Sequence, residues 1–129
     1  MKQAISLVTL LVPDYDEGIA FYVGQMGFNL LENKTLEDGR RWVVVAPPGG
    51  EGTRLLLVQA AGRKQKSRVG DQTGGPVALV LTTDSFERDF DRMRLHGVAF
   101  LEKPRREDYG IVAVFADPFG NKWDLIEPR

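Results

Sequence analysis

The chain has 129 residues, 43% of them hydrophobic, with no cysteine and a single histidine. This length suits one compact domain or two small modules that share a core. The lack of cysteine excludes disulfides, thiolate metal sites and a cysteine nucleophile, and it fits a cytoplasmic protein. A formal net charge of -1 gives no general attraction to phosphate backbones or anionic lipid. Nucleic acid and membranes are therefore not expected as partners.

The first module, residues 1–60, is predicted to contain a strand, a helix and three further strands. Residues 5–12 are rich in β-formers and end at Pro13, which suits a strand buried on both faces. A helix of about three turns follows, because Asp14 and Glu17 resemble a capping box and Gly27 stands where a left-handed cap is expected. The strand-like runs after it cover residues 28–33, 40–46 and 54–59.

Residues 61–75 show no periodicity and contain mainly glycine, polar and basic residues. We expect a solvated linker, although the basic side chains would also suit a lid over an anionic ligand. The second module, residues 76–129, repeats the order of the first. It is predicted to contain a strand over 77–82, a helix over 84–96, a strand over 98–103 and a terminal hairpin.

Helix caps and turns coincide between the two modules at a constant separation of 70 residues. Asp14 recurs as Asp84, and Gly27 recurs as Gly97. Such a duplication indicates two copies of one supersecondary unit, neither of which buries its apolar face alone. The predicted fold is α+β, with two tandem βαβββ modules forming a curved mixed sheet around a cleft and the helices outside.

The terminal hairpin has a turn that its residues identify. Residues 117–120, Asp-Pro-Phe-Gly, match a type I turn closed by a bulge. In that register Phe115 pairs with Trp123, and Val114 pairs with Asp124. Phe115 and Trp123 share a face that we expect to pack against the helix.

The opposite face of the hairpin is apolar except for one carboxylate, Asp124, which it shares with Val112, Val114 and Ile126. A charge in such a place is costly unless it has a partner or a function. Asp124 would serve as a general base or an anchor for a polar ligand group, with burial raising its pKa. Alternatively it pairs with Arg54, which occupies the equivalent position of the first module.

Three segments carry a resemblance to a known family: Val12-Pro-Asp-Tyr-Asp-Glu-Gly-Ile-Ala-Phe-Tyr22, Met26-Gly-Phe28 and Asp117-Pro-Phe-Gly-Asn-Lys-Trp-Asp-Leu-Ile-Glu127. They resemble the vicinal oxygen chelate superfamily, also called the glyoxalase, bleomycin-resistance protein and extradiol dioxygenase superfamily. The resemblance covers essentially the whole chain and implies the duplicated fold. It implies no single reaction, because the family includes lyases, isomerases, epimerases, dioxygenases, thiol transferases and drug-sequestering proteins.

The family's common mechanism uses a divalent metal held by His or Glu at inward-facing strand positions. By resemblance these positions fall at Leu7, at its counterpart Val77, at Asp124, and at Arg54 or Leu56, depending on the length of the first hairpin. Of these side chains, only that of Asp124 is able to bind a metal ion. We therefore expect no metal cofactor.

The resemblance then favours a homodimeric protein of the bleomycin-resistance kind, which binds a small, largely apolar organic molecule in its cleft. The alternative is a lyase, isomerase or dioxygenase-type enzyme, either metal-independent with Asp124 as its catalytic base or using ligands not identified here. A third possibility is a cleft filled by its own side chains. Trp42 is either an aromatic wall for the ligand or a core residue. The candidate ligand-binding residues are Leu7, Trp42, Arg54, Val77, Val112 and Val114.

Overall fold

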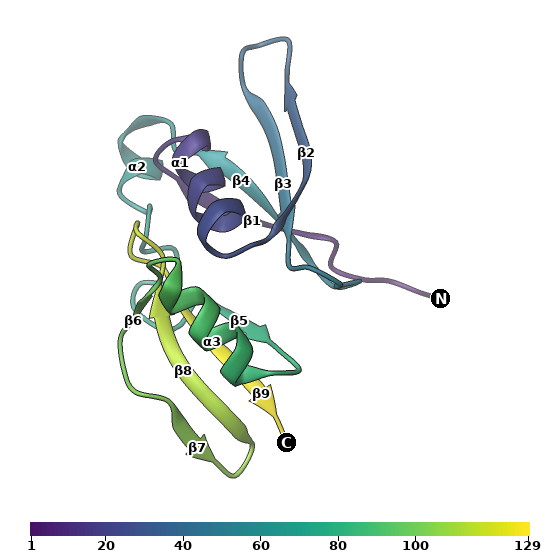
Figure 1. Ribbon diagram of the computed structural model, residues 1–129. Coiled ribbons are helices and arrows are strands. Elements are labelled where there is room, and N and C mark those ends of the chain that lie inside the picture. Colours follow the sequence, from purple (N-terminus) through teal and green to yellow (C-terminus); the bar gives the residue numbers. More distant parts are fainter. The chain divides into compact units, whose positions relative to one another are not determined.

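The computed structural model describes residues 1–129, which divide into two compact units, Met1–Val69 and Gly70–Arg129. Each unit has its own mixed sheet and its own helix (Figure 1). The α+β class and the two βαβββ modules are thereby confirmed. The strands form two separate sheets, one in each unit, instead of one continuous sheet.

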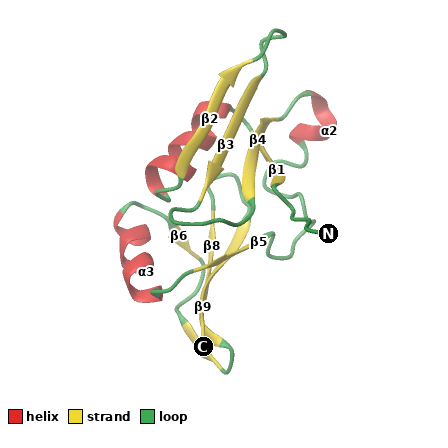
Figure 2. Cartoon of the chain, turned by 90° about the vertical axis from the view of Figure 1, so that its right-hand side faces the viewer, coloured by secondary structure: helices red, strands yellow, loops and turns green.

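Unit 1 contains a four-stranded sheet in the order β1-β4-β3-β2 (Figure 2). β1 runs parallel to β4, and the other neighbours are antiparallel. A short helix lies in the segment that was expected to be an irregular linker. The elements are β1 (Leu7–Val12), α1 (Tyr15–Ile19), η1 (Ala20–Gln25), β2 (Asn29–Thr35), β3 (Arg41–Ala46), β4 (Arg54–Gln59) and α2 (Gly62–Lys66).

The first helix begins as its sequence predicts, with the Asp14 carboxylate accepting a 3.0 Å hydrogen bond from the Glu17 N–H. Its second half differs from the expected regular helix, because α1 continues into the π-helix η1. In this wider turn the adjacent Phe21 and Tyr22 are both buried, with their rings edge to face. The helix ends at Gly27, whose φ of 79° provides the expected left-handed cap.

The core of unit 1 lies between this helix and one face of the sheet. Gly18 allows the close approach, since a Cβ there would lie 3.0 Å from a methyl of Val12 and 3.2 Å from a methyl of Leu57. We call the opposite side of the sheet the open face of unit 1, because the helix does not cover it. The buried residues on the helix side include Leu10, Val12, Val43, Val45, Leu55 and Leu57.

Unit 2 contains a sheet in the order β5-β9-β8-β6, with β7 also pairing with β8. The strand expected over residues 98–103 is confined to two residues, and the chain returns to the sheet only at Arg105. The elements are β5 (Leu79–Thr82), α3 (Phe86–Leu95), β6 (Ala99–Phe100), β7 (Arg105–Glu107), β8 (Gly110–Ala116) and β9 (Lys122–Pro128).

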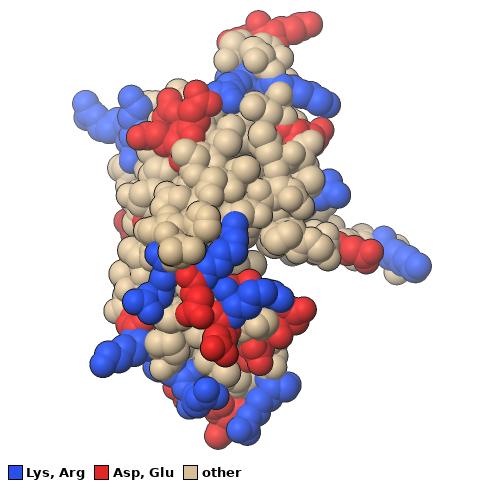
Figure 3. Space-filling model, in the orientation of Figure 1, with Lys and Arg blue, Asp and Glu red and all other residues tan.

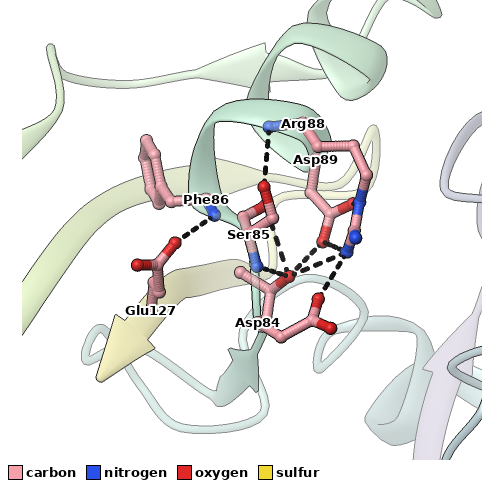
Figure 4. A network of polar contacts seen from close by, with 7 residues as sticks. Asp84, Ser85, Phe86, Arg88, Asp89 and Glu127 are labelled. Carbon is pink, nitrogen blue, oxygen red and sulfur yellow. Dashed lines mark hydrogen bonds and ion pairs between the residues drawn. The ribbon is translucent and has the colours of Figure 1, made fainter. Parts of the chain in front are cut away.

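Helix α3 begins one residue later than the repeat predicted. Ser85, not Asp84, is its N-cap, and the Ser85 hydroxyl accepts from the Arg88 N–H. Asp84 instead forms an ion pair with Arg88 at 2.7 Å (Figure 4). A second carboxylate, that of Glu127 at the end of β9, accepts a 2.7 Å hydrogen bond from the Phe86 N–H.

The core of unit 2 is a chain of aromatic rings that runs from α3 to the terminal hairpin. Neighbouring ring centroids lie 4.5 to 5.7 Å apart. Phe115 and Trp123 are part of it, which confirms their predicted role in packing against the helix. The exposed side of α3 carries intermixed acidic and basic side chains (Figure 3). The rings are those of Phe86, Phe90, Phe100, Phe115 and Trp123.

The register and turn of the terminal hairpin are also as predicted, with Val114 opposite Asp124. The turn is organised by Asp117, which is only 3% exposed. One oxygen of its carboxylate accepts three consecutive backbone N–H groups, of residues 119 to 121, and the other accepts from the Asn121 side chain. A buried carboxylate bonded in this way is fully satisfied.

Candidate ligand-binding site

The open face of unit 2 is the side of its sheet that α3 does not cover, and Asp124 lies near its centre. Strand pairing places Asp124 between Val114 of β8 and Val80 of β5. Val112, also predicted on this face, follows two residues before Val114 and is buried. Asp124 makes no hydrogen bond or ion pair within unit 2. Its carboxylate is thus a half-buried charge among valines, as the sequence predicted.

The pKa of Asp124 reflects these surroundings. Partial burial raises it above the usual value for an aspartate, and the negative charge of Glu102 acts in the same direction. The positive charge of Arg105 opposes both effects without cancelling them. Asp124 therefore holds its proton more tightly than a solvated aspartate does.

Arg105 is the centre of an ion-pair network beside Asp124. Its Nε lies 3.0 and 3.1 Å from the two carboxylate oxygens of Glu102, and its Nη1 lies 2.9 Å from Glu107. Glu102 is held in turn by the backbone N–H of Val114, which donates to it at 3.0 Å. These contacts raise the pKa of the Arg105 guanidinium further above its already high value. Arg105 is thus fixed by partners other than Asp124.

The Arg105 network was not predicted from the sequence. Residues 101–103 were expected to continue a strand, but β6 ends at Phe100 and the Leu101 N–H donates the segment's last hydrogen bond to β8, at 2.8 Å to the Val114 carbonyl. The Glu102 carboxylate then takes the place of a strand carbonyl as acceptor for the Val114 N–H. A signal for this lies in the closely spaced Glu102, Arg105 and Glu107, although their spacing alone is also typical of a solvated loop.

The open face of unit 1 contains a pocket with a volume of about 520 Å³. Leu7 and Arg54, both predicted ligand-binding residues, are cross-strand partners and both line it. The pocket combines apolar side chains with one guanidinium and two carboxylates. Its lining comprises Ala4, Ile5, Ser6, Leu7, Glu32, Val44, Glu51, Gly52, Thr53 and Arg54.

Trp42 shares the open face of unit 1, because it pairs with Lys34 of β2 and lies two residues from Val44. Its indole is half-buried and donates a 3.1 Å hydrogen bond from Nε1 to Glu32. This bond, together with Lys34 at 3.3 Å, lowers the pKa of Glu32. Trp42 is therefore not a core residue, which was the other interpretation of its sequence position.

No helix of the protein is both long and apolar enough to pass through a lipid bilayer.

A family model described as the Glyoxalase/Bleomycin resistance protein/Dioxygenase superfamily matches residues 4–125. The chain belongs to this superfamily. A protein of Shewanella frigidimarina is 49% identical over 128 residues, which cover 98% of this chain and 95% of the relative. The resemblance noted from the sequence is thereby confirmed.

Solved structures match all or nearly all of the chain. TnmS3, described as an antibiotic binding protein from Streptomyces sp. CB03234, is 32% identical with a TM-score of 0.76 and covers 100% of this chain and 98% of its own. UcmS2 is 26% identical with a TM-score of 0.84, covering 98% of this chain and 99% of its own.

The metal-ligand positions that the superfamily resemblance implied can now be placed by strand pairing. Val44 pairs with Leu56 in unit 1 as Val114 pairs with Asp124 in unit 2. Leu56, not Arg54, is therefore the counterpart of Asp124, because the β3–β4 hairpin is two residues longer than the β8–β9 hairpin. Of the two counterparts expected for Asp124, the strand pairing thus gives Leu56, and Arg54 does not occupy the equivalent position.

The position of Val77 also differs from the ungapped repeat. Val77 precedes β5. Because side chains alternate between the two sides of a strand, Val77 belongs to the same side as Leu79, which pairs with the core residue Trp123. Ala78 and Val80 belong instead to the side of the sheet that carries Asp124. The α3 cap shows the same one-residue shift, and a shift of one residue moves a strand side chain to the opposite side of the sheet.

A divalent metal does not fit the side chains at these superfamily positions. Leu7 and Leu56 have no donor atom, Ala78 has none either, and one carboxylate does not make a site. Glu102, whose negative charge acts on Asp124, is already bonded to Arg105 and to the backbone of β8. No group of three or more His, Cys, Asp or Glu side chains in the chain is arranged to hold a metal ion.

Proposed function

We propose that this protein binds a small, largely apolar organic molecule at an open sheet face, without the metal of the superfamily's enzymes. The observation that carries the proposal is the open face of unit 1. It places a half-buried Trp42 near a 520 Å³ pocket lined by Leu7, Val44 and Arg54. Ligand sites in proteins typically combine such apolar and aromatic lining with a few polar groups.

The comparison with TnmS3 supports the same function. TnmS3 is described as an antibiotic binding protein, and its likeness to this chain covers nearly all of both. A superfamily member that binds its ligand without chemistry needs no metal ligands. The replacement of the expected ligands by Leu7 and Leu56 agrees with that requirement.

The protein is proposed to act as a homodimer, as the resemblance implied. Light scattering on the purified protein would give the mass of a dimer, about twice the 14.4 kDa of one chain. A monomer at micromolar concentration would contradict this part of the proposal.

The test of ligand binding is a thermal-shift screen of aromatic antibiotics and related organic molecules. A ligand should raise the melting temperature in proportion to the logarithm of its concentration. It should also quench the fluorescence of Trp42, while Trp42→Phe leaves only the buried Trp123 and abolishes the quenching. Such a compound would exclude a cleft filled by its own side chains, and a screen in which no compound shifts the melting temperature would count against the proposed function.

The second candidate is a metal-independent enzyme, and the raised pKa of Asp124 favours it. A carboxylate that holds its proton more tightly is a better general base once ionised. Asp124→Asn should then abolish turnover of any compound that the protein converts, while leaving its binding and melting temperature nearly unchanged. Turnover that survives this substitution, or that requires an added divalent metal, would exclude the mechanism.

A further inference from the structure

The carboxylate of Asp124 has apolar neighbours on both adjacent strands. Val114 of β8 and Val80 of β5 are its cross-strand partners, and Ile126 follows on the same face of β9. Val80 is 61% exposed, so the surface beside Asp124 is open to a ligand. A half-buried charge with no hydrogen-bond partner in its unit is unfavourable, and a ligand that supplies a partner would remove that cost.

Arg105 does not supply that partner. Its guanidinium already bonds both oxygens of Glu102 and one oxygen of Glu107. Turning it toward Asp124 would break these bonds to two carboxylates. The four charged groups together carry one positive and three negative charges, so their field attracts a cation.

One other charged residue shares this face of β9. Lys122 lies two residues before Asp124, at the start of the strand, and its side chain is exposed. It is not among the groups that shift the pKa of Asp124, whereas Arg105 and Glu102 are. A solvated lysine of this kind is screened and does not replace a direct partner.

We propose that Asp124 binds a protonated amine of the ligand, whose apolar body then covers Val80 and Val114. This inference rests on the proposed function and narrows the ligand class to basic, largely apolar amines. A charge-assisted hydrogen bond to a partly desolvated carboxylate should contribute at least tenfold to affinity. Burial also raises the pKa of Asp124, and a bound ammonium group would lower it again.

Three probes with one ring system test the amine: 1-naphthylmethylamine, 1-naphthalenemethanol and 1-naphthoate. Calorimetry at pH 7 on the full-length protein should give an affinity for the amine about tenfold or more above that for the alcohol. The carboxylate should bind more weakly than both. Equal binding of amine and alcohol would overturn this inference and leave small-molecule binding intact.

Two variants test whether the preference for the amine depends on Asp124. Asp124→Asn should reduce the affinity for the amine about tenfold and change that for the alcohol by less than about threefold. Asp108→Asn removes the same charge from the exposed turn between β7 and β8 and should preserve the preference. If Asp124→Asn keeps the preference for the amine, or Asp108→Asn loses it, the assignment to Asp124 is wrong.

The outcome for the probes as a set separates the two proposals. Binding of the alcohol without a preference for the amine contradicts only the role of Asp124. Failure of all three probes to bind overturns the amine inference and also counts against the proposed function. Lack of a preference for the amine in the wild-type protein overturns the inference even if Asp124→Asn does not fold.

Discussion

Glu127 and Phe86 are joined by a 2.7 Å hydrogen bond, from the backbone N–H that opens α3 to the carboxylate near the end of β9. The two residues are 41 positions apart in the sequence. The last strand thus caps the helix that covers it, and a negative charge at a helix N-terminus is favourable. The bond fixes the start of α3 relative to the sheet.

Glu127→Ala should therefore destabilise the protein by about 1 kcal/mol, the usual value for the loss of a helix cap. Urea unfolding followed by circular dichroism measures it. Glu87→Ala provides a control, since Glu87 is an exposed acidic residue in the same helical turn. A Glu127→Ala protein that unfolds at the same urea concentration as the control would show that the bond contributes nothing.

Asp89 should make the free energy of unfolding depend on pH in the acidic range. Burial alone would raise its pKa, but hydrogen bonds from Arg88 and Thr83 outweigh burial and lower it. Because its folded-state pKa lies below the unfolded value, its contribution is present above pH 3.8 and is lost as the pH falls through the folded-state pKa.

The matching variant is Asp89→Asn, which should cost about 1 kcal/mol of unfolding free energy at pH 7. The difference from the wild-type protein should shrink as the pH is lowered below 3.8. Denaturant midpoints at pH 7, 5 and 3 give the comparison. A difference that stays constant across this range would mean that the Asp89 charge is not what stabilises the start of α3.

Gly70 should tolerate substitution less well than Gly74, another glycine with positive φ that precedes β5. A Cβ at Gly70 would lie 1.9 Å from the carbonyl oxygen of Phe119, at a φ of 75°. Gly74 has a similar φ of 77° and nothing within 4 Å of the same position. The two sites thus differ in the contact and share the backbone conformation.

Gly74→Ala should cost about 1 kcal/mol from the left-handed conformation alone. Gly70→Ala should cost at least about 2 kcal/mol more, because the hairpin turn must move. Comparing the thermal unfolding of both variants separates the cost of the clash with Phe119 from the cost of the left-handed backbone conformation. Equal melting temperatures for the two variants would show that the approach of Gly70 to the turn is not tight in solution.

Asp124→Asn should leave the free energy of unfolding unchanged or raise it slightly at pH 7, by up to roughly 0.5 kcal/mol. The folded-state pKa of Asp124 is raised, so its charge opposes folding at high pH, and this penalty disappears as the pH falls through that pKa and below 3.8. The gain should therefore vanish at pH 3. A marked loss of stability at pH 7 would instead indicate that the charge has a structural partner.

The sequence predicted the features that depend on neighbouring residues. The cap at Asp14 and the turn at Asp117 follow from short-range chemistry between a side chain and the backbone a few residues away. The pairing of Val114 with Asp124 followed from that turn, because the type and length of a hairpin turn fix the register of its two strands.

The features that sequence reasoning missed depend on residues distant in the chain or on small changes of length. Arg105 binds its carboxylate partners where β6 has ended after only two residues. No local sequence pattern predicts that early end of the strand. The counterpart of Asp124 is Leu56 only because one hairpin is longer. The roles of Leu7, Arg54 and Val112 in ligand binding stay predictions, as does that of Val77.

The extra length of the β3–β4 hairpin also restricts how its loop can be varied. An added pair of residues leaves Arg54 and Leu56 on the open face, because side chains alternate with a period of two along a strand. A single inserted residue would turn them inward and bring the core residues Leu55 and Leu57 to the surface. Insertions between Val45 and Leu55 should therefore come in steps of two residues if Leu56 is to stay on the open face.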